Sequence, residues 1–328
     1  MKPETIENIR AACPGPLRFL YHEDRESPWL LSRLLKGPAR IAEIRRAPYG
    51  KLIDRPALRP VVARCGGVLD PRQLALVGNP AAALAPGAPE VRDPAVRAGL
   101  DTALGGGLVH YPVTLDAWSE DRVADWRHAQ MSRRGANLVL QVNFPEEHDA
   151  AFHACLGPRM RDEFEYHGHP ISAGEPVTMA WVRIDFDRAD GDALIEEVQS
   201  DWFRFAREWG RTQRKRTRRS RRTTPADEYL QEVMPVYERG WERVSLLAAL
   251  MFLAGAGLRR VYLHETTAGA RLKRIRWVKP PRSLYTDLPS RFCFEPTNDA
   301  PAFLMRDRGK AVRNLRRSGR PVFWRLTL

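Results

Sequence analysis

The stretch from Ala193 to Trp202 constrains the fold most, because it starts as an apolar strand and then turns abruptly into acidic and amide side chains. A buried strand carries such groups at a desolvation cost unless each is paired or reaches solvent. Core packing does not account for them, so the pattern predicts a polar sheet face that holds a functional site. The polar residues are Glu196, Glu197, Gln199 and Asp201.

The segment upstream predicts a partner for this strand. Residues 179–186 alternate between apolar and polar side chains, and residues 187–192 are turn formers, so the two segments are expected to form a β-hairpin. Alternation divides their side chains between two faces. One face is expected to carry Val182, Ile184, Phe186, Leu194 and Val198, and the other Trp181, Arg183, Asp185, Glu197, Gln199 and Asp201.

Arg183 and Glu197 fall on the same predicted face and are expected to lie opposite each other. A cross-strand ion pair would stabilise the hairpin by roughly 0.2 to 1 kcal/mol. A catalytic role for either residue accounts for the pattern equally well, and the two roles are compatible.

The remaining pattern predicts an α+β fold. Strands are expected at 137–144, 259–265 and 321–328, and helices at 116–133, from about Trp241 to a glycine stop at 255–257, and at about 306–317, where the helix is basic. This order predicts a mixed, largely antiparallel sheet flanked by helices.

The chain is expected to divide into two regions. Residues 1–105 predict a helical N-terminal region broken by prolines, with an Ala/Pro-rich linker at 78–94, and residues 106–328 predict the α+β domain. Three glycines at 105–107 mark the boundary. They lack the GxGxxG spacing and the preceding strand of a dinucleotide site, so they indicate a flexible joint.

The positive charge is concentrated in one segment. The net charge is +13, and residues 211–222 hold eight basic residues and no acid, which leaves +5 for the rest of the chain. Like charges repel, so a mobile basic loop is expected at 208–226 that attracts nucleic acid or another polyanion. An ordinary arginine-rich surface is the alternative. The residues proposed for nucleic-acid binding are Arg214, Lys215, Arg216, Arg218, Arg219, Arg221 and Arg222.

The sequence predicts a cytoplasmic protein without a membrane span. Its longest apolar stretch, residues 244–256, is too short to cross a bilayer and predicts a buried helix. The first residues lack the apolar core of a secretion signal. Four cysteines are scattered without a CxxC pair, which fits a reducing compartment better than disulfides or zinc.

The chain resembles an uncharacterised domain of large polyvalent proteins of phages and mobile elements, whose hallmark is the string EEIQSDW. Matching features are the strand at 137–145, Arg183 with the Asp190-Gly191 turn, and residues 196–202. The likeness covers roughly residues 137–290. Trp181 stands where the family commonly has histidine, and residues 203–207 replace a Gln-x-Gly-Arg continuation. The resemblance implies phage or mobile-element ancestry and no particular reaction.

A weaker resemblance is to the GNAT acyltransferases, in which an antiparallel meander leads to a strand, a long helix and another strand. Residues 244–265 are similar to that half, and Tyr285 stands where the family often places its general acid. The resemblance implies acetyl-CoA or another acyl-CoA as cofactor. The diphosphate-binding turn, [Q/R]xxGx[G/A], is absent, since residues 239–242 contain one glycine.

Two hypotheses about function follow. The first is a phage or mobile-element effector domain, with GNAT-like acyl transfer in a polar cleft along residues 196–201. Its expected catalytic residues are Glu197 as base or orienter, Tyr285 as acid, and His264 in acid–base chemistry, and its expected substrate-binding residues are Arg183, Gln199, Asp201 and Trp202. The second is a non-enzymatic protein that binds nucleic acid, or a protein partner in a complex, through the basic segment.

The histidines do not predict a metal site. His148, His153, His167 and His169 with Cys155 are types that zinc prefers, but their spacing gives no compact set. His264 at a strand end has an alternative role too, as a histidine satisfied by neighbouring backbone groups. Ser200 beside Asp201 lacks a nearby base in the sequence, so a Ser-His-Asp arrangement is not expected.

Overall fold

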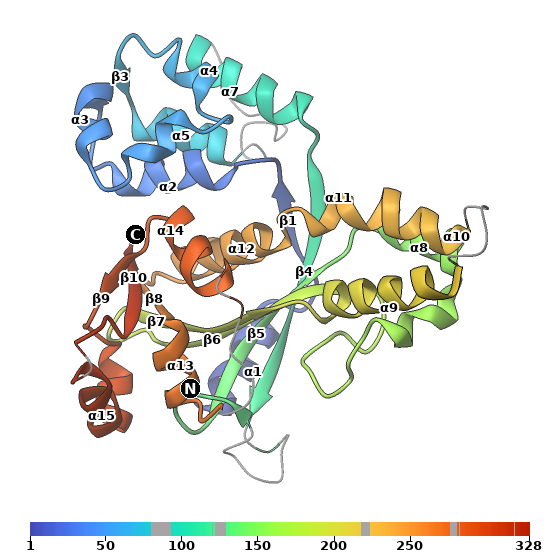
Figure 1. Ribbon diagram of the computed structural model, residues 1–328. Helices are drawn as coiled ribbons and strands as arrows, with labels where there is room; N and C mark the ends of the chain where they lie inside the picture. Colours follow the sequence, from blue (N-terminus) through green and yellow to red (C-terminus); the bar gives the residue numbers. More distant parts are fainter. Residues whose placement is uncertain are drawn as a thin grey trace.

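The computed structural model describes residues 1–79, 93–119, 121, 129–217, 224–275, 281, 283–317 and 319–328, with side chains undescribed at 213–217. The fold is α+β, as predicted, with a central sheet flanked by helices (Figure 1). Its strands run in the order β1-β4-β5-β6-β7-β8-β10-β9, and β7–β8 is the parallel pair among otherwise antiparallel neighbours in the described chain.

The sheet strands are β1 Leu17–Tyr21, β4 Val109–Ser119, β5 Ala136–Asn143, β6 Thr178–Asp187, β7 Asp192–Gln199, β8 Arg260–His264, β9 Glu295–Thr297 and β10 Phe323–Thr327. A separate short pair is β2 Ala39–Arg40 with β3 Val68–Leu69.

The helices are α1 Pro3–Ala12, α2 Glu26–Leu34, α3 Ile41–Arg46, α4 Arg59–Val62, α5 Pro71–Gly78, α7 Pro94–Gly105, α8 Glu146–Leu156, α9 Asp201–Thr217, α10 Pro225–Glu228, α11 Met234–Glu238, α12 Trp241–Gly255, α13 Thr266–Leu272, α14 Leu288–Arg291 and α15 Ala302–Arg316. Short 3-10 segments are η1 Gly50–Asp54 and η4 Pro158–Glu163, and short π segments are η5 Tyr229–Val233 and η6 Ser283–Asp287.

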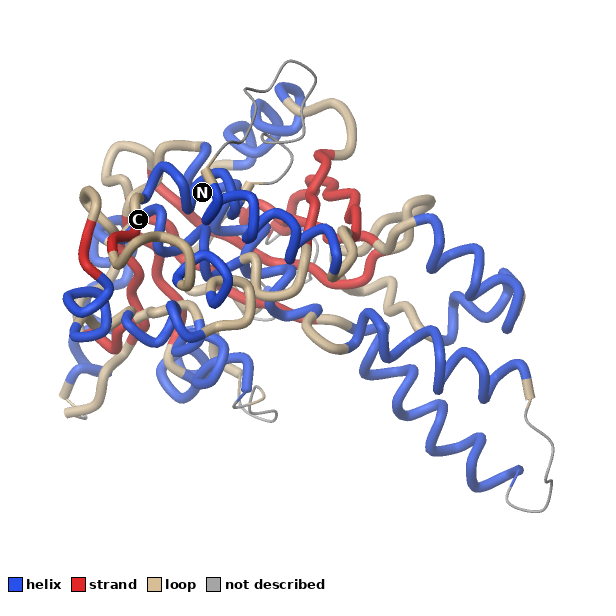
Figure 2. Tube along the Cα trace, turned by 90° about the horizontal axis from the view of Figure 1, so that it is seen from above, coloured by secondary structure: helices blue, strands red, loops and turns tan. Residues whose placement is uncertain are grey.

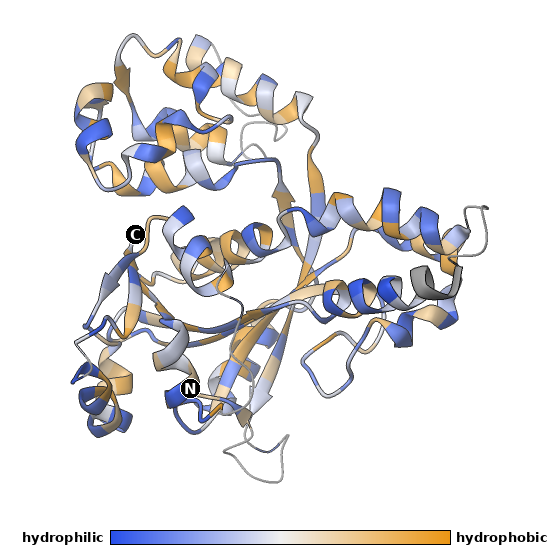
Figure 3. Ribbon diagram, viewed as in Figure 1, coloured by the Kyte–Doolittle hydropathy of each residue, from blue (hydrophilic) through white to orange (hydrophobic). Residues whose placement is uncertain are grey.

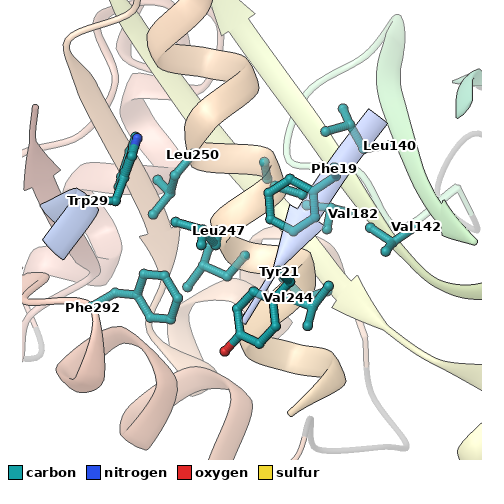
Figure 4. Packing of buried hydrophobic residues seen from close by; sticks show 14 of the residues in the cluster. Phe19, Tyr21, Trp29, Leu140, Val142, Val182, Val244, Leu247, Leu250 and Phe292 are labelled. Atoms are coloured by element: carbon teal, nitrogen blue, oxygen red, sulfur yellow. The ribbon is translucent and has the colours of Figure 1, made fainter. Parts of the chain in front are cut away.

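Helix α12 forms the core on one face of the sheet. It is apolar on nearly all sides, which is typical of a buried helix. Figure 4 shows Val244, Leu247 and Leu250 of α12 among side chains of β1, β5 and β6. Because such side chains have no room to relax, a Leu247→Ala change would cost about 2 to 5 kcal/mol. No described helix is long and apolar enough to cross a membrane.

The N-terminal region contributes a strand as well as helices. β1 pairs antiparallel with β4, and α1 packs against β4 and β5. Helices α2 to α7 form a lobe beside the sheet, which Figure 1 shows above β1. The prediction of a helical region over 1–105 therefore missed residues 17–21, and the proposed boundary near residue 105 stays a prediction.

A helical arm projects from the sheet. Figure 2 shows α9 and the helices that follow it extending away from the strands, and Figure 3 shows α9 as mostly hydrophilic beside the orange strands and α12. Its inner side is apolar, and Gly210 permits a close approach, since a Cβ there would lie 3.0 Å from Leu230 Cδ1. The arm carries the start of the basic segment away from the core.

Three sequence predictions need correction. The helix expected at 116–133 is wrong at both ends, because residues 116–119 are strand and 130–133 are non-helical. The basic loop expected at 208–226 is wrong over 208–217 and 225–226, which are helical, and residues 218–223 lie outside the described chain. Leu194 lies on the opposite face from the one predicted, in a small cluster with Tyr262.

Candidate functional site

A β-bulge in β7 gathers two carboxylates on one face of the sheet. Arg183 pairs with Glu197 and Ile184 with Ile195, so Glu196 has no partner in β6. The extra residue changes the phase of the alternation. Both glutamates therefore reach the face that carries Arg183, and Leu194 joins them there, which is why the simple alternation misplaced it.

Arg183 and Glu197 form the predicted ion pair. The Arg183 side chain is 2% exposed. It also donates to the carbonyl oxygens of Ala129, at 2.9 Å, and Gln130, at 3.1 Å. Its guanidinium lies 5.2 Å from the ring centroid of Trp118. These contacts fix the arginine, and the arginine in turn fixes the carboxylate.

The charge of Glu197 is well stabilised. Burial alone would raise its pKa, but Arg183 and Lys273 lower it further than burial raises it, so the pKa lies below its usual range. A paired, ionised carboxylate is a weak base. Of the two roles expected for Glu197, the geometry favours that of an orienting group over that of a base.

Glu196 is the centre of a buried hydrogen-bond cluster. Its carboxylate accepts from the Ser132 backbone N–H at 3.0 Å and from Ser132 Oγ at 2.8 Å, and it lies 3.0 Å from His264 Nε2. Burial would raise its pKa, yet the hydrogen bond and charge of His264 and the charge of Lys273 lower the pKa to about 2. Glu196 is fully buried, so this cluster stabilises the strand ends rather than meeting a substrate directly.

The cluster is not a Ser-His-acid triad. Ser132 Oγ and Glu196 both contact Nε2 of His264, whereas a triad acid and serine occupy different ring nitrogens. Nδ1 of His264 is buried without a hydrogen-bond partner in the described structure. Burial lowers the pKa of His264 despite the opposing effect of Glu196, so the neutral ring is favoured.

Strands β7 and β8 stop pairing halfway along β7, because β8 ends at His264. They pair in parallel only from Asp192–Arg260 to Ile195–Leu263, although β7 continues to Gln199. We call the edge of β7 at residues 196–199, which does not pair with β8, the β7–β8 gap. Two buried side chains, Lys273 and Tyr285, contact the main chain there.

The gap is closed by polar side chains rather than by another strand. Lys273 Nζ donates to the Glu196 carbonyl oxygen at 2.8 Å, and the hydroxyl of Tyr285 hydrogen-bonds the main chain of Val198. Burial raises the pKa of Tyr285, so its hydroxyl keeps its proton at neutral pH. Tyr285 is thus a protonated hydroxyl beside an edge of β7 whose main-chain groups bond side chains instead of a neighbouring strand.

Glycine lets α13 approach the gap. A Cβ on Gly269 would lie 2.6 Å from Cβ of His264. Only a residue without a side chain allows the helix to pack this closely on the strand end. The same helix ends beside Lys273, so its position determines where the lysine amine lies.

The outer end of β7 carries a more accessible dyad. His169 Nδ1 lies 2.7 Å from Asp201 Oδ2, and Gln199 Nε2 donates to Asp201 Oδ1 at 2.8 Å. Burial would raise the pKa of Asp201, but the hydrogen bonds from His169 and Gln199 and the charge of Arg204 keep it below its usual range. The His169 side chain is 26% exposed. A histidine held at Nδ1 by a carboxylate is oriented for proton transfer at Nε2.

The structure brings most predicted site residues together. Arg183, Glu197, Gln199 and Asp201 follow one face of the hairpin, and His264 and Tyr285 lie at its β8 side. Trp202 instead packs in an aromatic core, where its Nε1 donates to Tyr229 Oη at 2.6 Å. Its predicted part in substrate binding has no support from these contacts.

Sequence reasoning missed Ser132, Lys273 and the role of His169. Ser132 and Lys273 approach β7 from segments more than sixty residues away along the chain. No local spacing connects them to the EEVQSD string. His169 was considered only as a metal ligand, and its position beside Asp201 depends on a long connection between β5 and β6.

The other histidines do not form one site. His148 stacks on Phe144 with centroids 3.5 Å apart and contacts Tyr229. Asp162, Glu165 and His167 bring ligand atoms within 4.8 Å of one another. Arg161 lies 2.8 Å from Glu165, and its charge opposes a cation at that position.

Basic residues at the base of the arm are partly neutralised. Arg204 pairs with Asp201 at 2.6 Å, and Arg207 pairs with Glu238. Of the residues predicted to bind nucleic acid, 214–216 lie in α9 without described side chains, and 218, 219, 221 and 222 lie outside the described chain.

Comparisons of the chain with protein-family models, with curated proteins and with solved structures found no match.

Proposed function

We propose that the chain is a GNAT-like acyltransferase of phage or mobile-element type, which takes an acyl group from an acyl-CoA bound in the β7–β8 gap. One observation carries the proposal: β7 loses its parallel neighbour after Ile195, and side chains take up the main-chain groups thereby freed.

The chemistry of the donor fits this edge. The pantetheine arm of an acyl-CoA contains two amides, which alternate donors and acceptors much as a peptide does. A free strand edge binds such a chain by main-chain hydrogen bonds, as in recognition by strand addition. The arm would replace the contacts that Lys273 and Tyr285 now make.

The topology agrees with the same class. An antiparallel meander from β4 to β7 leads through α9–α12 to the parallel strand β8, and β10 lies between β8 and β9. This is the arrangement that the GNAT resemblance implies. Fold likeness alone carries little weight about function, so the gap remains the main argument.

The side chains that we assign to the reaction lie near the C-terminal end of β7, where Tyr285 bonds Val198 and His169 bonds Asp201. Tyr285 protonates the departing thiolate, since its hydroxyl retains a proton beside the strand. His169, held by Asp201, accepts a proton from an amine acceptor. Glu197 and Arg183 keep this part of the strand in place through their ion pair.

The chain lacks the second glycine of the usual diphosphate-binding turn. Recognition would therefore rest on the pantetheine arm. We expect acetyl-pantetheine to bind within about tenfold of acetyl-CoA, a difference of about 1.4 kcal/mol.

The test is calorimetric titration of the purified chain with acetyl-CoA, with acetyl-pantetheine, and with adenosine diphosphate as the control. Binding of both thioesters, and thiol release on addition of a primary amine, are the expected results. Tyr285→Phe should keep binding and slow thiol release by about tenfold or more, as expected for loss of a general acid. Absence of binding to either thioester contradicts the proposal.

A second candidate function is suggested by the arm. α9 projects from the sheet and continues into a segment with basic residues and no acid over 211–222 (Figure 2). A rigid helical base that presents positive charge away from the core suits a phosphate backbone. We propose that this arm contacts nucleic acid in a non-enzymatic role.

Its test is a salt titration of DNA binding. Each phosphate contact contributes about −0.7 to −0.9 to the slope of log K against log salt. Replacing the basic residues from Arg214 to Arg222 with glutamine should abolish binding while the melting temperature stays nearly unchanged. If DNA binding survives these replacements, the arm is not the DNA-binding site. Measuring acyl-CoA binding by the same variant shows whether the two functions are independent.

A further inference from the structure

Lys273 places an amine where β7 and β8 separate. Its side chain is 3% exposed, and Nζ donates to the carbonyl oxygen of Glu196 at 2.8 Å. Glu196 is the first residue of β7 beyond the pairing with β8. An ammonium has three N–H donors, and this carbonyl is the acceptor that the described residues provide.

The surroundings raise the fraction of Lys273 that carries a neutral amine. Burial lowers the pKa of Lys273 and the charge of Arg183 lowers it further, against the opposing effects of Glu197 and Glu196. A lysine with a lowered pKa has a larger neutral fraction and is a better nucleophile. No step of the proposed reaction on an external amine uses this group.

We infer that Lys273 is a self-acylation site, in which the chain transfers the acyl group of a bound acyl-CoA to its own amine. The inference rests on the proposed binding of acyl-CoA in the β7–β8 gap. The main-chain edge of β7 would hold the acyl-CoA by hydrogen bonds. Its thioester carbonyl carbon would then lie beside the Lys273 amine, which now donates to the Glu196 carbonyl oxygen.

The step is balanced without another reactant. The Lys273 nitrogen attacks the thioester carbonyl carbon, a C–N bond forms and the C–S bond breaks. The sulfur leaves as thiolate and takes a proton from Tyr285, which regains one from the amine nitrogen through solvent. The products are an amide on Lys273 and free coenzyme A.

Acylation would change the gap in a defined way. The amide keeps one N–H for the Glu196 carbonyl but has no charge. Glu197 and Glu196 would lose a positive neighbour, and the added acyl group would occupy space that a second donor needs. Self-acylation would thus limit further turnover.

The experiment follows acetylation of each lysine in the intact chain during incubation with acetyl-CoA, by peptide mass mapping. Lys36 and Lys310 are exposed and serve as internal controls. Lys273 should be acetylated at least about tenfold faster than either, since the bound thioester is held beside its amine whereas the control lysines meet the donor only by collision. The preference should vanish in urea.

The outcomes separate this inference from the function on which it rests. Acetylation of Lys273 no faster than that of the controls, with acetyl-CoA binding seen by calorimetry, overturns the inference and leaves the function. No acetyl-CoA binding overturns both. Lys273→Arg keeps a donor for Glu196, so it should still bind acetyl-CoA and remain unmodified. If that variant does not fold, the acetylation time course of Lys273 and the control lysines in the unaltered chain tests the inference by itself.

Discussion

The two edges of β7 are stabilised in different ways. Toward β6 the strand is paired along nearly its whole length, and Arg183 and Glu197 lie in register across it. Toward β8 the pairing stops at Ile195, and side chains from α13 and η6 complete the remaining hydrogen bonds. The first edge is made by residues close in sequence. The second depends on tertiary contacts and can be replaced by a ligand.

The largest effect is expected on the open edge, from Glu196→Ala. This change removes the acceptor for two groups of Ser132 and for His264, all buried. Each buried donor left without an acceptor costs about 1 to 3 kcal/mol, so the loss of the acceptor for all three should cost about 3 kcal/mol or more. Urea unfolding measures the loss, and Glu196→Gln, which keeps one acceptor, is the control. A loss below about 1 kcal/mol for the alanine variant would show that the cluster does not hold the strand ends.

A smaller effect is expected on the paired edge, from Glu197→Ala. The partner Arg183 keeps the carbonyl oxygens of Ala129 and Gln130, so the cost should be about 1 to 3 kcal/mol. Glu197→Gln should cost less. A double-mutant cycle with Arg183→Met measures the coupling. If the glutamine variant instead stays fully stable and loses thiol release, Glu197 takes part in the chemistry directly.

The packing of α13 on the open edge is tested by Gly269→Ala. The new Cβ would meet His264 at a distance that requires movement, so we expect a loss of about 1 to 3 kcal/mol. Gly255→Ala is the matched control, since Gly255 is also helical and a Cβ added there would meet no atom within 4 Å. It should be neutral or stabilising by up to about 1 kcal/mol. Equal effects of the two changes would contradict the close approach.

The smallest effect is the first stage of a pH dependence, which comes from His264. The folded-state pKa of His264 is lowered, so the unfolded chain binds a proton more readily, and stability is lost as pH falls below about 6.5. Glu196 gives a second stage, because its pKa is about 2 in the folded chain and 4.5 in the unfolded chain. The stability that this carboxylate contributes is complete above pH 4.5 and is lost as the pH falls from 4.5 to about 2.

Urea midpoints measured between pH 8 and pH 3 would show both stages. His264→Asn should reduce the first stage, since asparagine does not titrate in this range. The stage should not vanish, because burial also lowers the pKa of His22 and His148. An unchanged first stage in the variant would show that His264 does not contribute.

The pairing of β7 with β6 could be predicted from the sequence because it depends on residues that are close together in the chain. Alternation and a turn of Asp and Gly residues predict the hairpin, and the ion pair follows from the register. The bulge could not be predicted in this way. One extra residue reverses which side chains face each side of the sheet, and no residue type in the strand marks its position. Leu194 was therefore assigned to the wrong face.

The open edge could not be predicted because its partners come from distant segments. Ser132 and Lys273 have no spacing that ties them to β7. The helix wrongly expected at 116–133 has the same cause, since residues 116–119 take their hydrogen bonds from β5 rather than from their own segment. In α9, apolar contacts with Leu230 outweigh the repulsion that predicted a loop.

The most direct test of the account measures amide hydrogen exchange in β7 with and without acetyl-CoA. Binding of the donor along the open edge should slow exchange at residues 196–199 by about tenfold or more, while the amides of β6 change little, because paired amides exchange only when the strand opens. Protection confined to other elements, such as α9 or the N-terminal helices, or no change at residues 196–199 at saturating acetyl-CoA, would contradict the β7–β8 gap as the donor site.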